Sequence, residues 1–133
     1  MLGLATLAAA IAAPALAHHS FAVFDASRIV TLDGTVREFK WTNPHALIIL
    51  AVADGKAEPA QWAIEMNGPS GIAREGWKPK TLTPGMKVQV TIHPLLDGNS
   101  GGQYLAVKLP DGTQMGGPDG RGIGAEVRGR GHL

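Results

Sequence analysis

Hydrophobic and polar residues alternate along most of the chain between residues 29 and 109. A period of two is typical of β-strands that bury one face. Breaks in the alternation coincide with Gly, Pro, Asn and Asp, the residues typical of turns. The pattern predicts five strands, over residues 29–41, 45–53, 61–66, 86–95 and 104–109. We expect one shared core that contains Val36, Ile48, Leu50, Ile64, Val90, Ile92 and Val107.

The phase of the alternation changes within the first predicted strand. Apolar and small residues occupy even positions up to Val36, whereas Phe39 and Trp41 occupy odd positions. A change of phase after the interior Gly34 indicates a bulge or a sharp bend. In the last predicted strand the inward-facing set is Leu105, Val107 and Leu109.

A short helix is predicted over residues 70–75, with Ser70 as its N-cap and Gly76 after its end. We expect Trp77 to fold back over the core. Three strands, a helix and two strands, with a bent first strand, are typical of a five-stranded OB-type barrel. A β-sandwich is the alternative, but it normally needs about seven strands. The sequence therefore predicts an all-β fold, a small OB-like barrel with one short helix, over residues 18–113.

The two ends of the chain differ from this central region. Residues 1–17 are almost wholly apolar and small, and they end in Ala15-Leu16-Ala17. This is the pattern of a signal peptide with an A-x-A-like cleavage site, so we expect export to the periplasm. The alternative is a buried N-terminal helix, which would lack a polar face. No Lys or Arg precedes Arg28, so we expect the usual basic segment of a leader to lie upstream. Residues 114–133 are polar and rich in glycine, and we expect a disordered tail there.

Composition argues against several structural and functional classes. The chain has no cysteine, so a disulfide scaffold is excluded. Its 12 basic and 11 acidic residues form no basic stripe of the kind that nucleic-acid-binding proteins show. No second apolar stretch reaches the length of a membrane span, so we expect no membrane insertion once the leader is removed. We also expect no enzyme, because no nucleophile or acid–base pair is visible.

Histidines are the candidate functional residues of the chain. His45 lies between the first two predicted strands, and His93 ends the fourth. Loops at these places flank the usual ligand-binding face of an OB barrel, so we expect the two side chains on one side of the molecule. His18 and His19 precede the first strand, which pairs with the fourth in this topology, and we expect them to approach His93.

Imidazole nitrogens suit copper, zinc and nickel. Cleavage after Ala17 would also give His18 a free α-amine, and Cu(II) favours such nitrogen-rich sets. We therefore expect a bound transition metal, copper first and zinc second, held by His18, His45 and His93 with help from His19. No H-x-x-x-H or C-x-x-C spacing is present, and the competing interpretation is that each ring donates to a backbone carbonyl.

A different class of function is a binding surface without metal. Trp41, Asn43 and His45 lie together around the first predicted loop, and they could bind a small organic ligand or a periplasmic partner protein. Histidine-dependent metal uptake distinguishes the two hypotheses. Glu38 and Glu65 lie in strands, where isolated carboxylates are more often solvated than catalytic.

Several blocks of the sequence resemble a family of short exported bacterial proteins known only as a domain of unknown function. The blocks are "GTVREFKWTNPHALI", "WAIEMNGPSGIAREGWKP", "LTPGMKVQVTIHPLLDG" and "GGQYLAVKLPDG". The resemblance covers roughly residues 18–113, and it implies export and a small β-domain but no activity. The matching positions are His18, His19, Trp41, Asn43, Pro44, His45, Ser70, Gly71, Arg74, Gly76, Trp77, His93, Pro94, Asp97 and Gly98.

Overall fold

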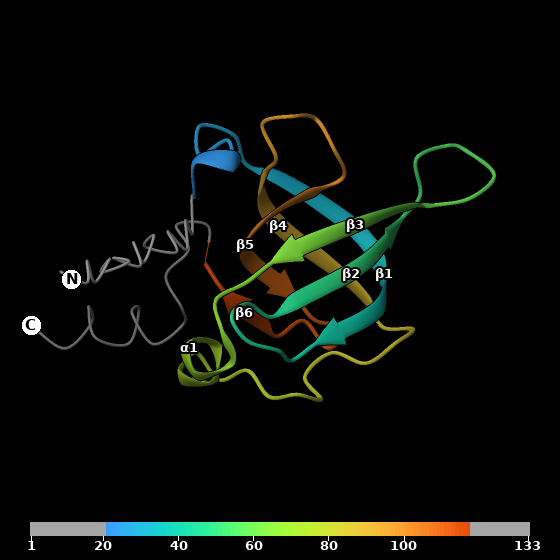
Figure 1. Cartoon of the computed structure of the whole chain (residues 1–133). Coiled ribbons are helices and arrows are strands. Elements are labelled where there is room, and N and C mark those ends of the chain that lie inside the picture. Colours follow the sequence, from blue (N-terminus) through green and yellow to red (C-terminus); the bar gives the residue numbers. More distant parts are fainter. Residues whose placement is uncertain (1–20, 118–133) are drawn as a thin grey trace, which may run out of the picture.

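Strands dominate the computed structural model, which describes residues 21–117 (Figure 1). The signal peptide predicted for residues 1–17 lies outside the described residues, as do residues 118–133. In chain order the elements are η1 (Phe21–Val23), β1 (Val30–Lys40), β2 (Leu47–Val52), β3 (Ala60–Glu65), α1 (Pro69–Arg74), β4 (Lys87–Pro94), β5 (Gly101–Lys108) and β6 (Gln114–Gly116).

Five of the strands close into a barrel. β1 pairs antiparallel with β2 and with β4, and the pairs β2–β3 and β4–β5 are also antiparallel. Residues 63–65 of β3 pair in parallel with residues 101–103 of β5, which closes the ring in the order β1-β2-β3-β5-β4. α1 connects β3 to β4 and lies beside one end of the barrel (Figure 1). This arrangement confirms the predicted OB-like barrel.

The predicted core is confirmed, because all seven residues expected to share it are fully buried in one cluster. Trp77 also lies in this cluster, at 2% exposure, as expected for a side chain that folds back over the core. Because large side chains from every strand of the barrel meet there, burial of apolar surface is the main stabilising contribution.

The predicted bend in β1 is present. The pairing of β1 with β2 shifts register between Val36 and Glu38, which is the signature of a β-bulge. Gly34 lies where β1 crosses β2 closely: a Cβ placed there would be 2.6 Å from Leu50 Cγ and 2.7 Å from the Ala51 carbonyl oxygen. A side chain at this position would therefore push the two strands apart.

Two local predictions need correction. The helix begins at Pro69, and Gly68 rather than Ser70 is the N-cap, with no side-chain capping bond. Proline starts the helix early because its fixed φ and missing N–H suit the first turn. In β5, the register against β4 skips Leu105, so Tyr104 joins Val107 in the core cluster. Leu105 is buried outside that cluster, and Leu109 is only partly buried against it.

The predicted start of the disordered tail is also corrected. Residues 114–116 form β6, which pairs with residues 106–108 of β5 beyond the point where β3 leaves that edge. Met115 is 8% exposed and belongs to the core cluster. β6 forms because it pairs with an otherwise unpaired edge of β5 and because it buries the apolar side chain of Met115. Within residues 21–117, no helix has the length and apolar character needed to cross a membrane.

Candidate functional site: a cleft with two histidines and two carboxylates

His45 and His93 line the same cleft, as expected from their places in an OB-type barrel. His45 lies just before β2 and His93 lies in β4. The cleft has a volume of about 230 Å³. Its other lining residues are Phe24, Glu65, Met66, Asn67, Glu75, Gln103, Tyr104 and Leu105.

Strand pairing brings the polar side chains of the cleft into line. Glu65 of β3 is the register partner of Gln103 in β5, and Gln103 is in turn the partner of His93 in β4. Their neighbours Ile64 and Ile92 point into the core. Because side chains alternate along a strand, the three polar residues lie on the outer face of the barrel. The parallel closure of β3 on β5 therefore places Glu65 and His93 on one row of the outer face, with Gln103 between them.

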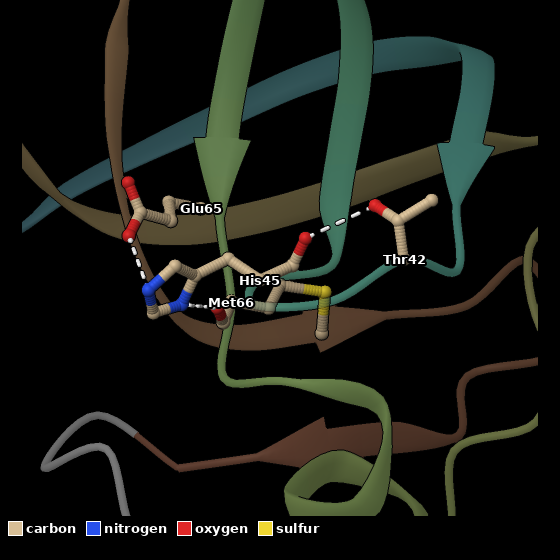
Figure 2. Close-up of polar contacts among 4 residues, drawn as sticks. All are labelled: Thr42, His45, Glu65 and Met66. Carbon is tan, nitrogen blue, oxygen red and sulfur yellow. Dashed lines mark hydrogen bonds and ion pairs between the residues drawn. The ribbon is translucent and has the colours of Figure 1, made fainter.

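The ring of His45 is held at both nitrogens (Figure 2). Nδ1 donates a hydrogen bond of 3.0 Å to the carbonyl oxygen of Met66, and Nε2 lies 3.5 Å from Oε1 of Glu65. The Thr42 hydroxyl donates to the backbone carbonyl of His45 at 3.2 Å. The imidazole is 26% exposed and the carboxylate 42% exposed, so solvent reaches both groups.

His93 is oriented in the same way. Its Nδ1 donates a hydrogen bond of 2.6 Å to the carbonyl oxygen of Arg28, which lies just before β1. The adjoining residue Pro94 accepts a hydrogen bond of 2.8 Å from the amide of Asp25. Both rings thus do what the competing interpretation of the sequence expected, since each donates to a backbone carbonyl. That bond occupies one nitrogen and, in a neutral ring, leaves the lone pair on Nε2.

The electrostatics of the cleft favour cations. Its lining contains Glu65 and Glu75 and neither lysine nor arginine. Burial raises the pKa of the Glu75 carboxyl, because the charged form loses solvation. Burial likewise raises the pKa of Tyr104, so its hydroxyl stays protonated and accepts a hydrogen bond from Trp77 Nε1. Near His93, the hydroxyl of Ser27 lowers the pKa of Asp25 by donating to its carboxylate.

The other predicted site residues are placed differently. Trp41 packs edge-on against Phe39, with ring centroids 5.8 Å apart, and is partly buried against the core. Asn43 is exposed and lies beside Gly68. Neither residue lines the cleft that contains His45. His18 and His19 lie outside the described residues.

Among the described residues, the ligating side chains of the cleft form one close pair rather than a complete metal site. Within residues 21–117, no group of three or more His, Cys, Asp or Glu side chains is close enough to hold one ion. His45 and Glu65 form the closest pair in the cleft. A metal bound there would need at least one further ligand.

From the sequence, Glu65 and Glu38 were both interpreted as solvated carboxylates in strands. Glu38 lies 3.7 Å from Lys40 on β1, whereas Glu65 faces His45. Gln103 and Glu75 were not considered at all. Gln103 is placed in the cleft by the closure of the barrel, and Glu75 by the turn after α1. Neither residue type nor its immediate neighbours in the sequence indicate that placement.

A second hollow, of about 530 Å³, lies over β1, β4 and the ends of β2 and β5. Its charged lining residues are Lys87, Lys108 and Asp33, and the rest are small, apolar or amide side chains. None of the residues predicted to bind a ligand or metal lies there. Of the predicted site residues, His45 and His93 therefore lie in the smaller cleft, and none lies in this larger hollow.

Fold and cleft together define a small OB-type barrel that carries an imidazole–carboxylate cleft on its outer face. The chain belongs to DUF6152, a family of unknown function, whose family model matches residues 6–105. This membership confirms the resemblance to a domain of unknown function. The matched range includes every histidine of the predicted site but ends before β6. No curated protein and no solved structure matches the chain.

Proposed function

We propose that this protein binds a transition metal ion, copper or zinc, in the cleft that contains His45 and His93. The observation that carries the proposal is the shared orientation of the two rings. Each donates its Nδ1 hydrogen to a backbone carbonyl, at 3.0 and 2.6 Å. Histidines that bind metals are typically held in this way, because the bond fixes the tautomer and reserves Nε2 for the metal.

The remaining ligands are expected from His18 and His19. The segment that follows them is bonded to the end of β4: the Leu96 amide donates to the Val23 carbonyl at 2.9 Å. Phe24, next in the chain, lines the cleft itself. His18 is three residues before Phe21 in the sequence, and a chain spans at most about 3.6 Å per residue, so the segment that joins them can extend over at most about 11 Å. This covalent tether supports a role for the N-terminal histidines.

Export is part of the same proposal. Cleavage between Ala17 and His18 would place a free α-amine beside the first imidazole and add a nitrogen donor. We propose that the leader is removed during transport to the periplasm and that the mature protein binds metal there. Expressing the full chain in a bacterial host and measuring the mass of the periplasmic product tests this step. A product that begins elsewhere than His18 would contradict it.

Metal titration of that product tests the binding site. We expect His45→Ala, His93→Ala and the double variant of His18 and His19 each to weaken binding by roughly tenfold or more, since even loss of an outer partner has that effect. His132→Ala is the matched control, because His132 is not among the proposed ligands. If the wild-type protein binds no more metal than a double variant of His45 and His93, the proposal is wrong, and a non-metal ligand or partner protein becomes the better hypothesis.

A further inference from the structure

The larger hollow lies toward the opposite end of the strands from the histidine cleft. It reaches the end of β2, the start of β4 and the end of β5, whereas the cleft is lined from the end of β3, the end of β4 and the first half of β5. None of the described residues lines both. A ligand in the hollow is therefore independent of a metal in the cleft.

Strand pairing brings two lysines to the same side of the hollow. Lys108 of β5 is the register partner of Gln89 in β4, and Lys87 lies two residues from Gln89 on the same face. Diagonal neighbours of this kind have backbones about 7–8 Å apart, which long side chains can bridge. Thr35 of β1 is the partner of Lys87 on its other side. Two ammonium groups and a hydroxyl therefore border one space.

These three groups are available to a ligand. In the part of the chain that the structure describes, no ion pair involves Lys87 or Lys108, and the hydroxyl of the partly buried Thr35 has no hydrogen-bond partner. The carboxylate of the lining, Asp33, already accepts a hydrogen bond of 3.1 Å from Nε2 of Gln89. Two positive charges against one negative leave the lining with a net charge of +1, which complements a monoanion.

The surface between the polar groups is apolar and small. It is formed by Gly34, Ala51, Ala53, Val88 and Leu109. The hollow has a volume of about 530 Å³, which lies within the range of about 300–1,000 Å³ typical of small-molecule sites. An inorganic ion would fill little of this space and would leave the apolar surface uncovered. Size and lining together favour an anion that carries a hydrocarbon body.

We propose that this hollow binds a small organic anion, a monocarboxylate. Its carboxylate contacts the two lysines and the hydroxyl of Thr35, and its hydrocarbon part lies over the apolar surface beside Ala51. A lysine ammonium acts as a compact point charge on a flexible stem, so the site selects charge and size rather than one rigid head group. This site goes beyond the proposed metal binding and does not depend on it.

A titration of the full-chain product with hexanoate, followed by NMR chemical shifts, tests the proposal. Hexanamide and hexylamine are the neutral and cationic probes of similar length, and acetate is the short anion. We expect hexanoate to shift the backbone amides of the lining residues in β1 and β4 and to bind at least fivefold more tightly than hexanamide. Hexylamine should not bind. Burial of one methylene group strengthens binding by about fourfold, so two that enter the hollow should make hexanoate at least tenfold tighter than acetate.

Substitutions in the hollow locate the ligand. Lys87→Gln and Lys108→Gln should each weaken hexanoate binding by about two- to fivefold, the range expected for an exposed ion pair. Lys80→Gln is the matched control, because Lys80 is exposed, lies outside the lining and changes the net charge equally. Thr35→Val keeps the shape but removes the hydroxyl, and Ala51→Leu fills the hollow without changing its charge. Both should weaken binding, and thermal unfolding of each variant shows that it is folded.

Several results would overturn the proposal. Equal affinities for hexanoate and hexanamide would show that the charge is not recognised, and equal affinities for hexanoate and acetate would show that the apolar surface is not covered. Equal losses in Lys80→Gln and Lys87→Gln would assign the effect to net charge rather than to a site. Wild-type affinity in Ala51→Leu would place the ligand elsewhere.

His45→Ala separates this inference from the proposed function. The variant should bind hexanoate as the wild type does, because His45 lines the cleft and not the hollow. Loss of hexanoate binding in this variant would place the anion in the cleft and refute the inference. Absence of metal binding by the wild type would refute the proposed function and leave this inference standing.

Discussion

Met115→Ala should destabilise the barrel by about 2–3 kcal/mol. Met115 is 8% exposed and lies in the core cluster, with its terminal methyl next to Gly76: a Cβ placed on Gly76 would be 3.7 Å from it. Replacement of a buried methionine by alanine typically costs about 2–5 kcal/mol. We expect the lower part of that range because β6 has three residues and lies at an edge, where the chain can relax.

Urea unfolding monitored by tryptophan fluorescence measures this loss. For a domain of this size, the expected change corresponds to a fall in Tm of roughly 8–24 °C. Gln114→Ala, at the exposed neighbouring position, is the control and should stay within about 0.5 kcal/mol of the wild type. Truncations after Thr113 and after Gly117 give a second comparison, because their difference isolates β6. Wild-type stability in both Met115→Ala and the shorter truncation would show that β6 does not pack on the barrel.

Three further predictions concern the same end of the molecule. Gly116→Ala should lower the free energy of unfolding by about 1–3 kcal/mol, because Gly116 has a φ of 75° and a Cβ there would collide with the Tyr104 hydroxyl and the Leu105 carbonyl. Chemical denaturation measures this loss, and wild-type stability would contradict the prediction. Tyr104→Phe should cost about 1–3 kcal/mol, because the buried Trp77 N–H loses the acceptor that it contacts at 3.2 Å; an unchanged Tm would show that another acceptor replaces the hydroxyl. Glu75→Gln should stabilise the protein near pH 7, because burial raises the pKa of Glu75 in the folded state above its unfolded value. The wild-type protein loses stability as the pH rises through the folded-state pKa of Glu75, because the carboxyl then ionises. The advantage of the variant should therefore vanish as the pH falls below about 4.5, where the carboxyl is protonated in both states. A pH-independent difference in stability would refute this explanation.

Much of the fold could be predicted because one signal, alternation with period two, determines both the strands and their buried faces. The seven predicted core residues lie in the central parts of strands, where neighbouring strands fix the direction of each side chain. The bend in β1 was also visible, since the bulge shifts the phase of the alternation after Gly34.

The errors arise where the backbone leaves regular pairing. In β5, Tyr104, Leu105, Ala106 and Val107 are all buried, so the sequence carries no alternation that would locate the bulge. β6 was missed because Met115 is a single apolar residue among glycines and polar residues. A segment of this composition has little intrinsic preference for a strand. It becomes one because the edge of β5 is available for hydrogen bonding and a gap in the core accepts the side chain.

The cleft could be predicted only in part, for a similar reason. General knowledge of the barrel's loops was enough to expect His45 and His93 on one side, because each lies at a strand end. Glu65 could not be selected from the sequence, since it is one of several carboxylates at outward positions in strands. Its relation to His45 depends on the β2–β3 register and on the hydrogen bond that turns the imidazole toward it.

The cleft is therefore assembled from two separate strand pairs. His45 lies just before β2 and Glu65 ends β3, so the antiparallel β2–β3 pairing brings their backbones together once that hairpin forms. His93 belongs to the β4–β5 pair, and it joins them only when residues 63–65 align with residues 101–103. A metal ligated from both sides would bind the closed barrel far more tightly than an open one, and by linkage it would stabilise that closure. If the proposed metal is ligated in this way, its binding and the stability of the β3–β5 contact should rise and fall together.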